Sequence, residues 1–177
     1  MRTLRLSLIG VFTLALLGGP SAMVVAQDDS MAPAMVTGTA TMTSHVSNGT
    51  FEYLDNGATL ESGQHFIHEW EASDPRLSGT STFIANWQRF ARANVQVDQT
   101  VRVVENGDGR WVGTGTDLWA GDGNKNTETV ILHGEDAYEG LTAYVIMSWE
   151  PPGAPQASFV AAIFPGEMPP VPDLPAE

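Results

Sequence analysis

The sequence predicts an all-β fold, most simply an antiparallel up-and-down β-barrel of about eight strands. Three observations carry this prediction. Apolar and polar residues alternate with a two-residue period in many short segments, turn signals rich in Gly and Asn separate these segments, and no long segment has a helical period. Consecutive hairpins favour closure of the sheet, because closure removes the exposed edges that promote aggregation. A two-sheet β-sandwich is the alternative that the same pattern allows.

The hairpin expected over residues 126–149 is the best-specified element. Val130 and Leu132 share one face of its first strand, and a row of alternate apolar residues runs from Leu141 to Trp149 on its second. The segment between the two strands begins and ends with glycine, so the chain can reverse within a few residues. We expect the other strands to lie beside this hairpin.

The remaining strands are expected in order along the chain. Their expected positions are residues 36–43, 50–54, 64–72, 77–90, 95–103, 110–120 and 157–164, with turns at Asn48-Gly49, Ser73-Asp74-Pro75 and Asn106-Gly107-Asp108-Gly109. The clearest alternation is a row of valines at 95, 97, 101 and 103 that also contains Gln99.

The first 26 residues are typical of a secretory signal peptide. Arg2 and Arg5 precede an apolar run from Leu6 to Leu17, and small residues lead to Ala26. The run is shorter than the ~20 apolar residues that a membrane anchor needs, so we expect a secreted, extracellular protein without stable membrane insertion. Residues 27–35 are expected to form a flexible leader, residues 36–165 the β-barrel domain, and residues 166–177 a disordered Pro-rich tail.

Composition narrows the function classes. The net charge of −13 repels nucleic acid phosphates and anionic membranes, so no nucleic acid partner is expected. The chain has no cysteine, so its core must hold the fold without disulfides. No phosphate-binding loop or Gly-x-Ser-x-Gly motif is present, and no cofactor is expected.

Metal ligation is not expected either. The 4 histidines, at positions 45, 65, 68 and 133, include no pair two residues apart on one strand face, which disfavours a zinc site. Asp122, Asn124, Asn126 and Glu128 alternate as in a calcium loop, but Thr127 stands where an EF-hand requires glycine. A solvated hairpin loop is the preferred interpretation.

Polar residues that share a strand face with large apolar residues are the candidates for a ligand site. If these faces point inward, they bring an imidazole, an amide and a carboxylate to an aromatic-lined cavity suited to ligand binding or acid–base chemistry. The candidate set is His68, Trp70, Trp87, Gln99, Asp117 and Trp119, and no catalytic residue is assigned. The alternative is that His68 and Gln99 are core groups with satisfied hydrogen bonds and that Asp117 faces water.

Residues Thr129 to Leu141, T-V-I-L-H-G-E-D-A-Y-E-G-L, resemble a strand and turn of the allene oxide cyclase and dirigent group of barrels. Gly134, Tyr138 and Gly140 occupy matching places, and Asp136 stands where the pattern usually has glycine. Residues 110–116 are similar to the preceding strand of bacterial barrel-like relatives, so the resemblance covers Arg110 to Leu141. It implies an eight-stranded barrel with an apolar cavity and often homo-oligomers, but no matched position has a catalytic role in that group. Small lipocalin-like barrels compare equally well with the rest of the chain.

We therefore expect a secreted barrel that binds a small apolar ligand or serves as an extracellular interaction module. The resemblance implies a rival, an isomerase or cyclase acting on a hydrophobic substrate. A structural exported barrel with a filled core is a further alternative. An empty interior pocket with the candidate residues on its wall favours the first two over the third.

Overall fold

The computed structural model describes residues 31–120, 126–150 and 154–172. The expected signal peptide, residues 27–30 of the expected leader, positions 122 and 124 of the expected hairpin loop and the last residues of the Pro-rich tail lie outside the described residues. Within the described ranges, no helix combines the length and the apolar composition needed to cross a membrane.

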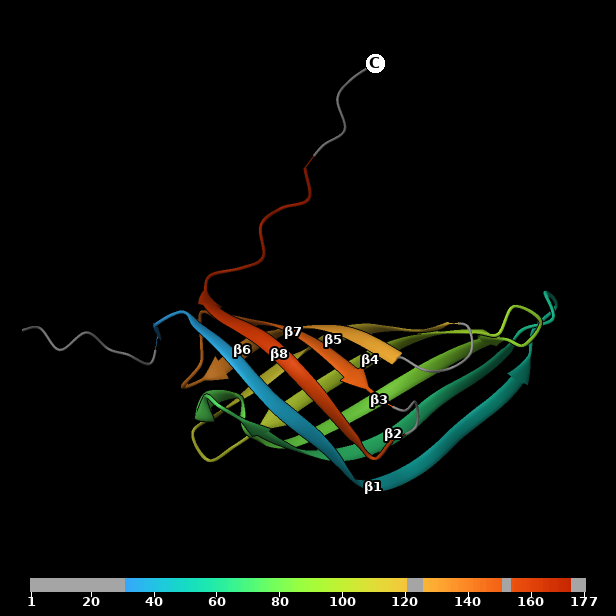
Figure 1. Ribbon diagram of the computed structural model, residues 1–177, viewed down its shortest axis with the longest axis horizontal. Helices are drawn as coiled ribbons and strands as arrows, with labels where there is room; N and C mark the ends of the chain where they lie inside the picture. Colours follow the sequence, from blue (N-terminus) through green and yellow to red (C-terminus); the bar gives the residue numbers. More distant parts are fainter. Residues whose placement is uncertain (1–30, 121–125, 151–153, 173–177) are drawn as a thin grey trace, which may run out of the picture.

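Eight antiparallel strands form one sheet that closes into a ring (Figure 1). The strands are β1 (Ala34–Tyr53), β2 (Thr59–Ala72), β3 (Gly79–Phe90), β4 (Val95–Glu105), β5 (Gly109–Ala120), β6 (Asn126–Asp136), β7 (Leu141–Trp149) and β8 (Gln156–Pro165). Each strand pairs with the next, and β8 returns to pair with β1. The all-β class and the succession of antiparallel hairpins are thus confirmed. The last strand runs one residue past the predicted end at position 164, because Pro165 still pairs with Leu141.

The hairpin predicted over residues 126–149 is confirmed as β6 and β7. Its register runs from Asn126 opposite Trp149 to His133 opposite Thr142, and the inward apolar rows of both strands are buried. The turn uses left-handed backbone at Asp136, with φ of 59°, and at Gly140, with φ of 82°. Gly134 is required for a different reason, because a Cβ there would overlap the carbonyl group of Tyr138.

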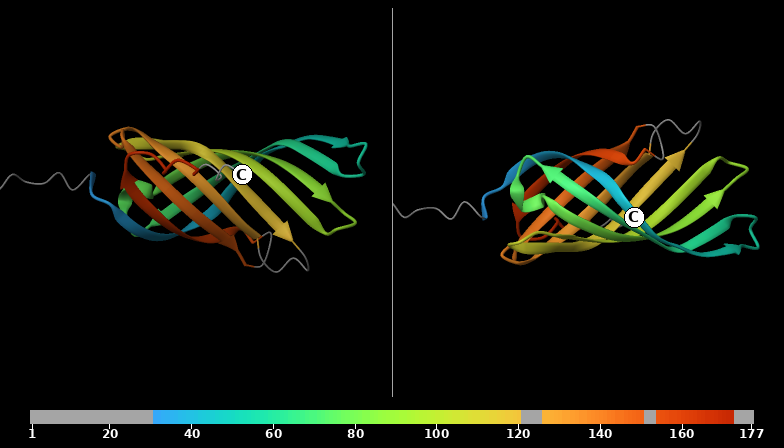
Figure 2. Two further views of the ribbon diagram at one scale, coloured as in Figure 1. Left: turned by 90° about the horizontal axis from the view of Figure 1, so that it is seen from above. Right: turned by 90° about the horizontal axis from the view of Figure 1, so that it is seen from below.

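The prediction of two strands separated by a turn at Asn48-Gly49 is wrong. β1 is one long strand that pairs with β2 from Gly38 to Tyr53, and register shifts after Met42 and after His45 mark its irregularities. Gly49 has φ of 61° inside the strand, opposite the Ser62-Gly63 pair. The left-handed freedom of glycine serves a strand irregularity as well as a turn, so the dipeptide alone does not distinguish them. The far part of the β1–β2 hairpin extends beyond β8, together with the β3–β4 hairpin beside it (Figure 2).

The interior face of β4 is the opposite of the one that its valines suggest. Gln96, Asp98, Thr100, Arg102 and Val104 are buried, whereas the valine row lies on the outer face with Gln99. The prediction that Gln99 lines the interior is therefore wrong. Its side-chain amide instead donates to the Thr116 hydroxyl on the outside of β5, at 3.2 Å. The physical reason is that this part of the interior is polar, so the apolar row of the strand marks its outer face.

One end of the ring is filled by side chains. Trp111, Leu132, Leu141 and Ile163 are nearly or fully buried there in the main apolar cluster. The single-turn 3-10 helix η2 (Pro75–Leu77) between β2 and β3 adds Leu77 to the same cluster.

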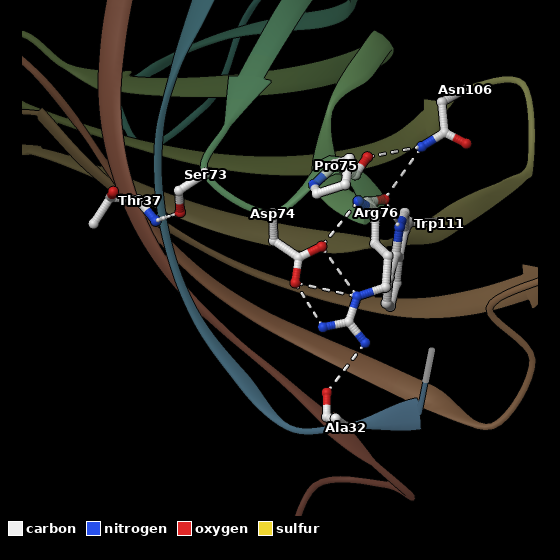
Figure 3. Close-up of polar contacts among 8 residues, drawn as sticks. All are labelled: Ala32, Thr37, Ser73, Asp74, Pro75, Arg76, Asn106 and Trp111. Atoms are coloured by element: carbon white, nitrogen blue, oxygen red, sulfur yellow. Dashed lines mark hydrogen bonds and ion pairs between the residues drawn. The ribbon is translucent and has the colours of Figure 1, made fainter. Parts of the chain in front are cut away.

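A polar network holds η2 at this end (Figure 3). The Trp111 indole N–H donates to the Arg76 carbonyl oxygen at 2.7 Å, and the Asn106 amide donates to the Ser78 carbonyl oxygen at 3.0 Å. The Arg76 guanidinium pairs with Asp74 at 2.6 Å and also donates to the Ala32 carbonyl oxygen at 3.1 Å. Because the backbone carbonyls of the turn are satisfied in this way, the end stays closed.

Candidate functional site

A cavity of about 180 Å³ lies inside the ring, toward the end opposite η2. Its walls come from every strand except β8. The lining residues are Met42, Phe66, His68, Phe83, Trp87, Asp98, Thr100, Asp117, Trp119, Asn126, Glu128, Trp149 and Ala154. The ring is therefore filled at one end and hollow at the other.

Aromatic side chains form much of the cavity wall. Phe66 and Phe83 are cross-strand partners on β2 and β3, and their rings stack with centroids 5.0 Å apart. Trp87 continues the stack at 5.7 Å from Phe66, while Trp119 and Trp149 contribute from β5 and β7. Stacked rings of this kind give a rigid apolar surface that suits the face of a planar ligand.

Three carboxyl groups lie in a row on β4, β5 and β6, which form another part of the wall. Asp98 on β4 pairs in register with Asp117 on β5, which pairs in turn with Glu128 on β6. All three are buried, with 3%, 6% and 1% of their surface exposed. Three buried acids side by side require neutralisation by a cation or by protons.

Glu128 is neutralised by a buried arginine. The Arg102 guanidinium donates to one Glu128 carboxylate oxygen at 2.7 Å, and the Thr100 hydroxyl donates to the other at 2.7 Å. The guanidinium carbon also lies 4.3 Å from the centroid of the Phe83 ring. Gly115 leaves the space for this network, since a Cβ there would lie 2.6 Å from the Thr100 hydroxyl oxygen.

Asp98 and Asp117 have no such cation. Gln96 donates to one oxygen of Asp98 at 3.1 Å, and the Trp119 indole N–H donates to one oxygen of Asp117 at 3.2 Å. The Oδ1 atom of each is buried, and the two carboxyl groups hydrogen-bond to each other when one of them is protonated. Burial raises the pKa of Asp117 to about 8, with the Asp98 and Glu128 charges adding to the effect, and burial raises the pKa of Asp98 to about 6. Near neutral pH the pair therefore holds one proton.

His68 reaches the cavity from β2 as a neutral imidazole. Its ring meets Phe83 edge to face at 4.7 Å, and its Nδ1 atom has no partner within the described ranges. Burial, and then the charge of Arg102, lowers the pKa of His68 to about 3. The imidazole is thus a neutral hydrogen-bonding group on the wall.

The candidate residues from the sequence divide into three groups. His68, Trp87, Asp117 and Trp119 line the cavity, so the alternative that Asp117 faces water is wrong. Trp70 lies deeper, packed on Phe159 in the filled part of the ring. Gln99 is on the outer face, as described above.

Sequence reasoning missed Asp98, Thr100, Arg102 and Glu128. A signal was present, because polar residues at 96, 98, 100 and 102 alternate with the valines. Alternation separates the two faces of a strand but does not say which one is interior.

No group of three or more His, Asp or Glu side chains in the described ranges has an arrangement that would hold a metal ion.

Comparison of this chain with protein-family models and with curated protein sequences finds no match. The resemblance to the allene oxide cyclase and dirigent group stays a prediction. The argument for function therefore rests on the geometry of the cavity.

Proposed function

We propose that the ring is an up-and-down β-barrel whose lumen binds a small, mainly apolar molecule. The observation that carries the proposal is the cavity of about 180 Å³ between stacked aromatic rings, in a ring that is filled at its other end. Burying carboxyl groups without a paired cation is costly, so Asp98 and Asp117 in the cavity wall are expensive for a purely structural protein. A ligand that meets them explains why they are kept.

The size of the cavity limits the ligand. A dry protein cavity of roughly 150 Å³ takes up benzene. The cavity in this chain, at about 180 Å³, therefore suits a molecule with one ring and a short arm rather than a long acyl chain. The signal-peptide pattern of residues 1–26 supports a site of action outside the cell.

Two experiments test this function. Native mass spectrometry of protein purified from its host looks for a co-purifying small molecule. Isothermal titration calorimetry with benzene, indole and phenethyl alcohol measures binding directly. Saturable binding of at least one probe is expected in the wild-type protein.

Matched variants locate the binding to the lumen. Ala154→Trp places a large side chain on the cavity wall and should abolish binding. Ile84→Trp places the same side chain on the outer face and should leave binding unchanged. If no molecule co-purifies and no probe binds, the proposed function is wrong. Equal binding by Ala154→Trp and Ile84→Trp would place the site elsewhere.

The acid pair supports a second candidate function, an isomerase or cyclase that uses general acid catalysis. A protonated Asp117 in an aromatic cavity can donate its proton to a substrate oxygen, such as that of an epoxide. Turnover of a small aryl epoxide above background, lost in Asp117→Asn and reduced in His68→Ala, would support this candidate. Wild-type turnover at the background rate would exclude it for that substrate class.

A further inference from the structure

We propose that the preferred occupant of the cavity is a protonated amine on a small hydrocarbon body, held between the carboxyl groups of Asp98 and Asp117. This inference rests on the binding function proposed above and names its ligand class. It follows from the geometry, the charges and the walls of the cavity, taken in turn below.

The geometry places two carboxyl groups side by side in the cavity wall. Asp98 and Asp117 face each other across β4 and β5, more than nine-tenths buried, and both line the cavity. Gln96 and Trp119 hold one oxygen of each carboxyl and so fix its orientation. The Oδ1 atoms are buried, and the two carboxyl groups hydrogen-bond to each other when one of them is protonated. An ammonium group, which carries three N–H donors and no acceptor, can replace that shared proton and donate to both carboxyl groups at once.

The charged groups around Asp98 and Asp117 leave an uncompensated negative charge that one bound cation would balance. The Glu128 charge is matched by Arg102 at 2.7 Å. On β3, Arg89 is half exposed, donates to the Gln96 amide oxygen at 2.8 Å and lies 4.0 Å from Glu61, so its charge is shared with these groups and offsets that of Asp98 only weakly. On β2, His68 is neutral. An anionic ligand would face two carboxyl groups without a nearby cation, whereas an ammonium ligand supplies the missing charge.

The walls suit the rest of such a ligand. Phe83 is already covered by the Arg102 guanidinium, but Phe66, Trp87, Trp119 and Trp149 present further aromatic surface to the cavity. Aromatic faces attract cations as well as hydrocarbon, most strongly where water is excluded. A single-ring or short alkyl amine can therefore place its ammonium group against the two carboxyl groups and its hydrocarbon body against the aromatic rings.

Protonation gives the binding a distinctive pH dependence. The empty pair keeps a proton near neutral pH, because burial and mutual repulsion raise both pKa values. An ammonium ion makes two negative charges tolerable, so its binding releases that proton. Affinity should rise between pH 6 and pH 8, the range set by the two aspartates. An alkylammonium stays charged throughout this range, as lysine does.

The test compares three probes of similar shape by isothermal titration calorimetry. These are phenethylamine, the neutral phenethyl alcohol and the anionic 3-phenylpropionate. At pH 8 we expect the amine to bind about tenfold more tightly than the alcohol, the scale of one charge-assisted hydrogen bond, and the anion most weakly. The preference for the amine should shrink at pH 6, and two buffers of different ionisation enthalpy should report proton release.

Conservative variants assign the effect to the pair. Asp98→Asn and Asp117→Asn should each lower amine affinity about tenfold while alcohol binding, which also checks the fold, stays within about twofold. Glu71→Gln removes an exposed carboxylate from β2 and should change neither. If a variant fails to fold, the pH dependence of the amine-to-alcohol ratio in the wild-type protein remains decisive.

The outcomes separate the two proposals. The amine inference is overturned if phenethyl alcohol binds at least as tightly as phenethylamine at pH 8, if their ratio is independent of pH, or if it survives both substitutions. In each of these cases alcohol binding leaves the proposed binding function standing. Binding of none of the three probes contradicts both proposals.

Discussion

The buried ion pair between Arg102 and Glu128 gives the sharpest prediction about what holds the interior together. Both side chains are almost fully buried, at 0% and 2% exposure, and their closest atoms are 2.7 Å apart. Arg102→Met removes the cation and keeps most of the side-chain volume. Glu128 then stays beside Asp117 with only the Thr100 hydroxyl as a donor.

The expected loss is about 3–5 kcal/mol of the free energy of unfolding, the range measured when one partner of a buried pair is removed. Since 1 kcal/mol shifts the thermal midpoint of a domain of this size by roughly 3 °C, the midpoint should fall by about 10 °C. The double variant Arg102→Met/Glu128→Gln leaves no unpaired charge and should recover more than half of the loss.

Urea unfolding followed by tryptophan fluorescence measures these changes, and a constant slope with denaturant confirms that the two folded states are comparable. The matched control is Arg110→Met, which breaks the exposed pair with Glu135 and should leave the midpoint unchanged. The reasoning is refuted if Arg102→Met costs less than about 1 kcal/mol, the usual value of an exposed pair. It is also refuted if the double variant is as unstable as the sum of the two single variants.

Four further predictions concern the same interior and the closed end. Gly115→Ala should destabilise the fold by about 1–3 kcal/mol in urea unfolding, because its Cβ would press on Thr100 and Glu128, whereas Gly107→Ala, in open space, should have no effect. The raised pKa values of Asp98 and Asp117 mean that the folded state binds more protons than the unfolded state between about pH 4 and pH 8, so the pair lowers stability as pH rises. The Asp117→Asn variant should therefore gain stability relative to wild type from pH 5 to pH 8. A stability difference between the two proteins that is independent of pH would contradict this. The lowered pKa of His68 has a separate consequence, since stability should be lost as pH falls below 6.5 and His68→Gln should reduce that loss in the same titration. Trp111→Phe keeps an aromatic ring but removes the 2.7 Å hydrogen bond to the Arg76 carbonyl oxygen, and should cost about 1–2 kcal/mol of the free energy of unfolding. Native-state hydrogen exchange should be accelerated in residues 73–78. Unchanged exchange there would show that the bond does not hold η2.

Much of the strand order follows from local sequence. The β6–β7 hairpin and the turn at Asn106 to Gly109 are predicted correctly because alternation and glycine act over a few residues. Asn48-Gly49 is the instructive failure. Its positive φ is real, but the pairing of β1 with β2 on both sides of Gly49 keeps the chain extended where an isolated segment would turn.

The site was only partly accessible from sequence. His68, Trp87, Asp117 and Trp119 were found because each shares a face with large aromatic or apolar groups. Gln99 was chosen by the same criterion and lies outside, while Asp98 one residue earlier lies inside. The criterion assumes an apolar interior, and it fails where the interior is polar.

The sequence by itself determined that this chain forms short antiparallel strands, where most of them begin and end, and which residues share a face, because these depend on backbone chemistry and a two-residue period. Tertiary structure decided which face of β4 points inward and brought Asp98, Asp117 and Glu128, which are far apart in the chain, into one row. The physical reason is that strand register is set across hydrogen-bonded neighbours and ring closure. Local sequence cannot specify which distant residues become cross-strand partners.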